Sequence, residues 1–157
     1  MTIQTDYGVV EYKQEDLVIF PDGLFGFPKL TRYLLLRLNE EEDDDSMLLM
    51  LSVEDPHVVF VLINPFFLCP DYSPVLTPEE LICLDAKDSE ELSYHSICVV
   101  RSDYLENTVN LKCPLIINPK TRHGIQVILE NTLYEYSHKL RSFPAITGGG
   151  QNADSST

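Results

Sequence analysis

Short apolar runs separated by turn-forming segments follow one another along most of this chain. Runs rich in Val, Ile, Leu and aromatic residues, bounded by Pro, Gly, Asn or Asp about every 8–12 residues, are typical of the strands of a β-barrel or β-sandwich. We therefore predict a hairpin over residues 2–13 and strands over residues 17–20, 33–38, 47–51, 58–63, 93–101, 108–112, 115–118 and 125–129.

The run at residues 58–63 is the clearest of these strands. Its side chains carry no polar atom, and an Asp-Pro and an Asn-Pro turn signal flank it. A short apolar run bounded in this way fits a strand covered on both faces better than a helix. We expect residues 66–69 to continue as an extended exit strand, in which one of Phe66 and Phe67 faces the core and the other faces outward.

One short helix is predicted from residue 77 onward. Thr77 is a good N-cap, Pro78 suits the first helical position, and Glu80 at the third position completes a capping box. We expect one further helical turn near residues 89–92. Parallel βαβ units would need several long helices, which this pattern does not predict. The predicted fold class is therefore mainly β, with one or two short helices.

The length of 157 residues predicts a single domain. We place this domain at residues 1–143. Residues 144–157 are rich in Gly, Ser and other polar residues that cannot build a core, so we predict a disordered C-terminal tail there.

The cellular location follows from the hydropathy pattern. The first six residues form a short polar stretch with no basic start, unlike a signal peptide. No apolar run approaches the ~18 residues that a membrane span needs. We therefore expect a soluble, cytoplasmic protein.

The charge balance favours some partners over others. The chain carries 25 acidic and 11 basic residues, a formal net charge of −14. Because nucleic-acid binding depends on Lys and Arg, direct binding of RNA or DNA is not expected, and neither is binding to anionic membranes. The acidic charge favours a basic protein partner, or simply solubility. The six consecutive carboxylates of residues 40–45 are expected to form a solvated loop, which aids solubility or steers a basic partner.

The sequence offers no recognisable catalytic or metal-binding motif. It lacks the GxGxxG and GKS/T phosphate loops, and its four cysteines are spaced unlike a zinc site, so we expect buried, reduced thiols. We expect His57 to be exposed and His95 to be structural. Glu54 and Asp55 could form an acid–base pair, but a turn in which Asp55 caps local amides is favoured. We therefore predict a protein that is not an enzyme and holds no cofactor or metal.

The apolar segment at residues 65–68 is the best candidate for a binding surface. Its bulky side chains either cross the rim of the core or form an apolar groove that receives a partner's amphipathic helix, with Tyr72 as a rim anchor. The candidate partner-binding residues are Asp55, Asn64, Phe66, Phe67, Asp71 and Tyr72.

Four motifs occur in order along the chain. They are FPDGLFGF at residues 20–27, SVEDP…VLINPFFLCPDY at residues 52–72, NLKCPLIIN at residues 110–118, and HGIQVIL at residues 123–129. In this order and spacing they resemble the flagellar assembly factor FliW family, over about residues 1–143. Cys113 stands where we expect a small Ala in that family.

This resemblance implies a small, irregular antiparallel β-barrel and a regulatory role. Proteins of that family bind unassembled flagellin through its terminal helical region. When free of flagellin, they bind and antagonise the translational repressor CsrA, which relieves repression of flagellin mRNA translation. Two alternatives stay open, namely a non-catalytic interaction module with another partner and a small β-barrel enzyme.

The way in which this chain would antagonise CsrA can also be predicted. An acidic protein can mimic RNA, with carboxylates interleaved with aromatic rings, or it can bind to one side of the RNA site. Residues 40–45 contain no aromatic residue, and residues 66–72 contain Asp71 as their sole carboxylate. We therefore expect binding to one side, with Asp71 and Tyr72 at the contact.

Overall fold

The computed structural model of the chain describes residues 1–5, 8–37, 47–99, 106–130 and 133–143. Its strands within these ranges are β1 (Thr2–Thr5), β2 (Gly8–Glu11), β3 (Val18–Ile19), β4 (Arg32–Arg37), β5 (Met47–Ser52), β6 (Val59–Ile63), β7 (Ser93–Val99), β8 (Thr108–Val109), β9 (Leu115–Asn118), β10 (His123–Gln126) and β11 (His138–Lys139). The helices of the same ranges are α1 (Pro65–Leu68) and α2 (Pro78–Cys83), with 3₁₀ turns at Gln14–Asp16, Ser89–Glu91 and Leu140–Ser142. The acidic run at residues 40–45 and the predicted tail at residues 144–157 lie outside the described residues.

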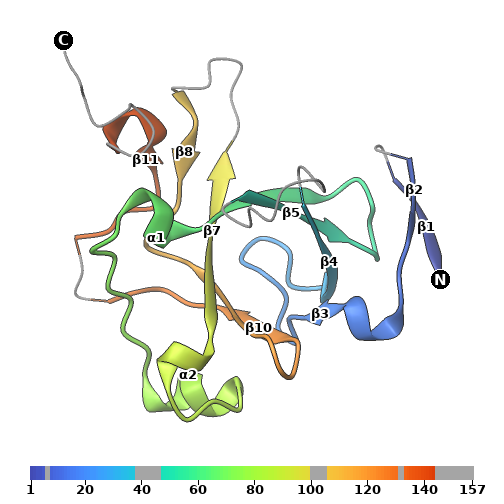
Figure 1. Cartoon of the computed structure of the whole chain (residues 1–157), viewed down its shortest axis with the longest axis horizontal. Coiled ribbons are helices and arrows are strands. Elements are labelled where there is room, and N and C mark those ends of the chain that lie inside the picture. Colours follow the sequence, from blue (N-terminus) through green and yellow to red (C-terminus); the bar gives the residue numbers. More distant parts are fainter. Residues whose placement is uncertain (6–7, 38–46, 100–105, 131–132, 144–157) are drawn as a thin grey trace.

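Seven strands of the described part close into a barrel, in the order β3, β4, β5, β6, β7, β9 and β10, with β10 returning to β3 (Figure 1). The prediction of a mainly β fold with a small, irregular barrel is confirmed. Neighbouring strands are antiparallel except β3 and β10, which pair in parallel at Ile19 and His123. These two strands are far apart in the sequence, so no hairpin turn dictates their direction.

Strand β7 closes the ring because it pairs with β9 as well as with β6. One edge pairs with β6 through Ser96, Ile97 and Cys98. The other edge is shared, since β9 pairs with its first half and β8 with its last two residues. Between β8 and β9 the chain leaves the ladder at residues 111–114, in a bulge that supplies a key contact of the site described below.

The buried side chains form one cluster inside the barrel and two outside it. The inner cluster contains Phe20, Tyr33, Met50, Leu62 and Leu115, among others. Strand neighbours of these residues, such as Ile63 and Ile116, point outward into a second cluster beneath α1 and α2. A third cluster lies between β4, β5 and the N-terminal hairpin. Barrel strands covered on both faces need continuous apolar runs, which explains the pattern seen in the sequence.

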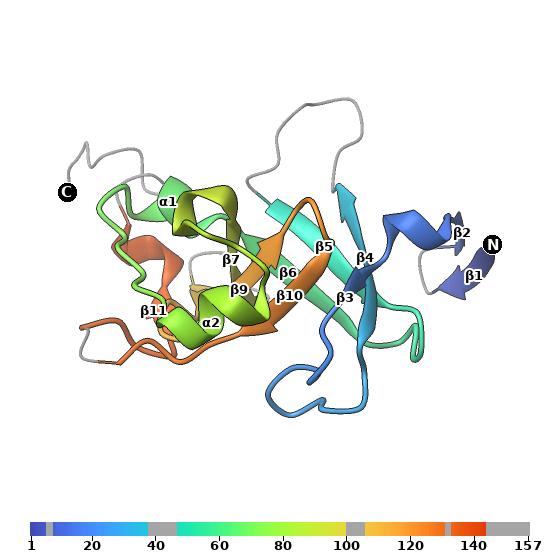
Figure 2. The ribbon, with the colours of Figure 1, turned by 90° about the horizontal axis from the view of Figure 1, so that it is seen from below.

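The N-terminal hairpin of β1 and β2 extends from one end of the molecule (Figure 2). Its residues Ile3 and Val10 pack against the third cluster. The predicted hairpin is thus confirmed, and it forms a two-stranded sheet of its own beside the barrel.

The predicted helix after Thr77 is confirmed as α2. The Thr77 hydroxyl accepts from the backbone N–H of Glu80 at 3.2 Å, and the Glu80 carboxylate accepts from the backbone N–H of Thr77 at 2.8 Å. At the other end, the side chain of Asn118 donates to the Leu84 carbonyl at 2.7 Å, which ties α2 to the β9–β10 hairpin. The further helical turn is the 3₁₀ turn at Ser89–Glu91.

Several predictions about local structure are wrong. The strand predicted over residues 108–112 ends at Val109, and the strand predicted over residues 125–129 is observed at His123–Gln126. Residues 65–68 form helix α1, not an extended exit strand, because Asn64 caps the helix and Pro65 occupies its first position. Thr77 and Pro78 start α2 in the same way, with a capping side chain followed by proline at the first helical position. Among the cysteines, Cys98 and Cys113 are buried as expected, but Cys69 is half-buried and Cys83 is exposed on α2.

The turn at residues 21–27 provides a test of the fold. Gly23 and Gly26 both have positive φ, +68° and +87°, but a Cβ on Gly23 would lie 2.5 Å from the Phe27 carbonyl oxygen, whereas one on Gly26 meets nothing within 4 Å. Gly26→Ala should lower the free energy of unfolding by about 1–2 kcal/mol, the cost of left-handed backbone. Gly23→Ala should cost a further ~1–3 kcal/mol, because the backbone must move. Urea denaturation of both variants measures this, and equal losses would contradict the turn geometry.

Candidate partner-binding cavity

Helix α1 presents two aromatic rings at the surface. The Asn64 side-chain oxygen accepts from the backbone N–H of Phe66 at 2.9 Å and so fixes the start of the helix. Over this single turn Leu68 points into the core, whereas Phe66 and Phe67 stay 39% and 46% exposed. The predicted division, with one of the two rings in the core, is therefore wrong, since helical geometry turns Leu68 inward instead.

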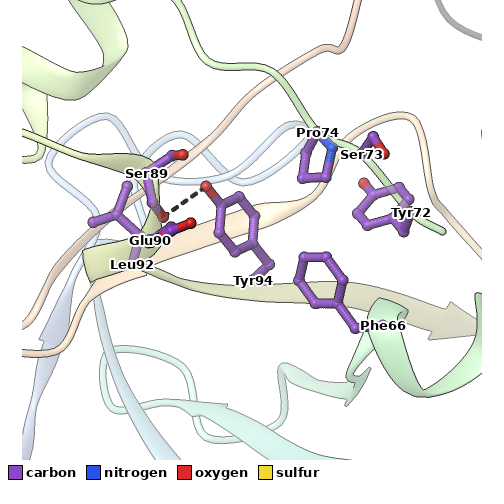
Figure 3. A pocket seen from close by; sticks show the side chains of 8 residues that line it. All are labelled: Phe66, Tyr72, Ser73, Pro74, Ser89, Glu90, Leu92 and Tyr94. Atoms are coloured by element: carbon purple, nitrogen blue, oxygen red, sulfur yellow. Dashed lines mark hydrogen bonds between the residues drawn. The ribbon is translucent and has the colours of Figure 1, made fainter. Parts of the chain in front are cut away.

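An open cavity of 480 Å³ lies between α1, the connector that follows it, and β7 (Figure 3). We call it the aromatic cavity. Its lining residues are Phe66, Tyr72, Ser73, Pro74, Ser89, Glu90, Leu92 and Tyr94.

The Phe66 ring is held between two tyrosines. It meets Tyr72 and Tyr94 edge-on, with ring centroids 5.6 Å apart in each pair and interplanar angles of 69° and 89°. Edge-to-face pairs are a favoured arrangement and add about 0.5–1.5 kcal/mol each beyond burial. The exposed ring is therefore held in place by the wall of the cavity, and the residue remains 39% exposed.

Tyr72 anchors the connector to the barrel. Its hydroxyl donates to the Leu111 carbonyl at 2.6 Å, and only 3% of the residue is exposed. This carbonyl is free for Tyr72 because the chain leaves the ladder at the bulge, where the Asn110 side chain accepts from the backbone N–H groups of Lys112 and Cys113. The ring of Tyr134 stacks at a tilt on Tyr72, 4.7 Å away.

Tyr94 forms the opposite wall of the cavity. Its side chain rises from β7, and its hydroxyl donates to the Ser89 carbonyl at 3.0 Å (Figure 3). The 3₁₀ turn that offers this carbonyl is closed by Glu91, whose carboxylate accepts from the backbone N–H groups of Asp88 and Lys87. These two hydrogen bonds lower the pKa of the Glu91 carboxyl.

The cavity is apolar with an acidic edge. Burial raises the pKa of Tyr72 and of Tyr94, so both phenols are neutral near pH 7 and act as donors. Glu90 is the charged member of the lining, and it is exposed. This combination suits apolar side chains flanked by a basic group.

The structure brings together only some of the predicted site residues. Phe66 and Tyr72 line the cavity, and Asn64 supports Phe66 as the cap of α1. Tyr72 is a buried part of the wall and not the rim anchor that was expected, because its hydroxyl is bonded inside the protein. Phe67 and Asp71 are exposed near the cavity but do not line it.

Asp55 belongs to a different part of the molecule. It lies in the turn between β5 and β6, where its side chain accepts from the backbone N–H of His57 at 3.2 Å, and its own N–H donates to the Ser52 hydroxyl. This is the capping turn that was favoured over an acid–base pair. Neither Asp55 nor Glu54 lines the aromatic cavity; the Glu54 carboxylate instead accepts from the backbone N–H groups of Thr31 and Arg32.

Of the eight lining residues, the sequence predicted only Phe66 and Tyr72. Tyr94 and Leu92 were not singled out, although alternation along β7 places Tyr94, Ser96 and Cys98 on one buried face. That alternation could have identified Tyr94. The sequence contains no comparable signal that the 3₁₀ turn would pack opposite α1.

Two further features of the described residues bear on chemistry. No group of three or more His, Cys, Asp or Glu side chains in this part of the chain is arranged to hold a metal ion. Within the same residues, every helix is too short or too polar to cross a membrane.

The fold and the cavity together define a small closed β-barrel with an open, mainly apolar cavity on its outer face. The sequence matches the model of the "FliW protein" family over residues 2–140. It is 40% identical to the flagellar assembly factor FliW of Symbiobacterium thermophilum over 115 residues, which are 73% of this chain and 82% of the relative. It is 33% identical to that of Shouchella clausii over 150 residues, 95% of this chain and 99% of the relative.

A solved structure agrees with these matches. A crystal structure of the flagellar assembly factor FliW superposes with a TM-score of 0.82 at 33% identity, covering 89% of this chain and 96% of the other. This chain belongs to the FliW family of flagellar assembly factors.

The geometry of α1 predicts how truncations should affect stability. Leu68→Ala should lower the free energy of unfolding by about 2–5 kcal/mol, since it empties a buried site. Phe66→Ala should cost about 1–2 kcal/mol through its two ring contacts, and Phe67→Ala about 0.5 kcal/mol or less. Urea denaturation distinguishes these values. A loss at Phe66 or Phe67 as large as that at Leu68 would mean that a ring lies in the core.

Proposed function

We propose that this flagellar assembly factor acts in the cytoplasm, without catalysis, as a binding protein for unassembled flagellin. When free of flagellin, it binds and antagonises the translational repressor CsrA, which relieves repression of flagellin mRNA translation. The observation that carries this proposal is the aromatic cavity at α1, together with membership of the FliW family.

The aromatic cavity supports binding of the terminal helical region of flagellin. An amphipathic helix binds by laying its apolar face into a groove. Phe66 offers an exposed ring that is already held in position by Tyr72 and Tyr94, so little conformational entropy is lost on binding. Phe67 adds a second exposed ring beside it.

The acidic composition supports binding of a basic RNA-binding protein. A formal charge of −14 accelerates the encounter with such a partner and repels RNA from the complex. Near the cavity the acidic groups include Asp71 and Glu90, both of which are exposed.

The arrangement of charges and rings favours binding to one side of the repressor's RNA site. Mimicry of RNA would need a surface of alternating carboxylates and aromatic rings, but the cavity combines several rings with the single carboxylate of Glu90. Of the two predicted contacts, Asp71 is free to interact through its exposed side chain. Tyr72 can contribute only a small accessible part, because the residue is 3% exposed.

The flagellin proposal is tested by titrating the full chain with flagellin and following heat release. Phe66→Ser should weaken binding about tenfold or more, because the exposed ring is lost from the interface. Val9→Ser, which removes an exposed apolar side chain from the N-terminal hairpin, is the matched control and should bind as the unaltered chain does. Equal affinity of all three proteins would contradict a role for the cavity.

The CsrA proposal is tested by stopped-flow kinetics and RNA titration. The association rate should fall as salt rises from about 0.05 to 0.5 M, because the Debye length shortens from roughly 14 to 4 Å. At several fixed concentrations of this chain, added RNA should restore the repressor–RNA complex only to a plateau. Full restoration with a mere shift in apparent affinity would show direct competition. A gel shift of RNA by this chain alone would refute the expected lack of RNA binding.

A further inference from the structure

A second open groove, of 530 Å³, lies on the surface near the start of α2. We call it the Phe25 groove. Its lining residues are Phe25, Val75, Thr77, Glu80, Gln126, Val127, Ile128 and Glu130. They come from the turn before β4, the connector that precedes α2, α2 itself and the segment that begins at the end of β10 (Figures 1 and 2).

Large apolar side chains face solvent in this groove. Phe25 is 54% exposed, Val75 is 79% exposed and Ile128 is 43% exposed. Scattered exposed apolar residues are common, but three that line one concave surface are a feature of binding sites. None of the three belongs to a buried cluster of the described residues.

The groove is held in a fixed shape. The Gln126 side chain accepts from the backbone N–H of Phe25 at 2.8 Å and donates to the Cys113 carbonyl at 3.3 Å. It thus fastens the Phe25 turn to the barrel wall. Positive φ at Gly23 and Gly26 makes that turn tight and leaves Phe25 projecting at its tip. A preformed apolar surface loses little entropy when a ligand covers it.

The charged side chains that line the groove have one sign. Its lining contains two carboxylates, Glu80 and Glu130, and no Lys or Arg among the described residues. Glu80 is fixed by the capping box of α2, whereas Glu130 is exposed. A second copy of this chain would bring a further charge of −14 to the surface, so self-association is disfavoured. A cationic occupant is electrostatically complementary.

The Phe25 groove is separate from the aromatic cavity. The two share no lining residue, and along the connector Pro74 belongs to the cavity while Val75 belongs to the groove. The two are therefore distinct sites that adjoin at this connector.

From this geometry we propose that the Phe25 groove is a second docking surface, which receives a short cationic amphipathic segment of a protein partner. Apolar side chains of that segment cover Phe25, Val75 and Ile128, and its Lys or Arg residues pair with Glu130 and Glu80. The inference does not depend on the proposed binding of flagellin or CsrA, because it rests on a different surface.

The test uses a fluorescent peptide of about 14 residues, four helical turns, with Leu on one face and Lys on the other. A counterpart with Glu in place of Lys is the charge control. In anisotropy titrations with the full chain, the Lys peptide should bind more tightly than the Glu peptide. Val75→Ser combined with Ile128→Ser should weaken the Lys peptide about tenfold or more. Glu130→Gln should reduce the salt dependence of binding.

Ile82→Ser is the matched control, because Ile82 is also exposed but lies on α2 outside the lining, and it should leave binding unchanged. The proposal is overturned if neither peptide binds, if both bind equally, or if Ile82→Ser weakens binding as much as the groove variant. It is also overturned if Phe66→Ser, and not the groove variant, abolishes binding. Sedimentation that shows a dimer lost in the groove variant would assign the surface to self-association instead.

Discussion

Strand β7 is the element on which the rest of this structure depends, because its two edges join the two ends of the sheet and so close the barrel. It pairs with β6 on one side and with β9 and β8 on the other. The second edge can be shared only because the chain leaves the ladder between β8 and β9, and this bulge turns the Leu111 carbonyl toward Tyr72. The same strand supplies Tyr94. Barrel closure therefore places both tyrosines around Phe66, and the candidate site is a consequence of the topology.

Most of the fold could be predicted because its strands are local patterns. The apolar runs at β5, β6 and β9 and the capping box of α2 are specified by adjacent residues, and each was found. The parallel pairing of β3 with β10 could not be found, because it joins segments about a hundred residues apart with no turn to set their direction. The two-residue strand β11 was also missed, because so short a segment cannot show the alternation of apolar and polar residues that marks a strand.

The candidate site was predicted in part, for a related reason. Phe66 and Tyr72 were found because they stand in one conspicuous apolar segment. The error at α1 came from reading that segment with a period of two, although Asn64 and Pro65 together form a helix start. Tyr94 and the turn at Ser89–Glu91 are brought to the site by tertiary packing alone, which the local sequence does not show. The net charge of −14, in contrast, is a property of composition. It predicts that a preferred partner is positively charged, but not where on this chain that partner binds.

The central claim is that the aromatic cavity binds flagellin. Hydrogen–deuterium exchange of the full chain, with and without flagellin, tests it most directly, because backbone amides covered by a partner exchange more slowly. Added protection should concentrate in residues 66–74 and 89–94, with little change in the β1–β2 hairpin. Protection confined to the Phe25 groove or to the hairpin, with residues 66–74 unchanged, would contradict the assignment of the cavity.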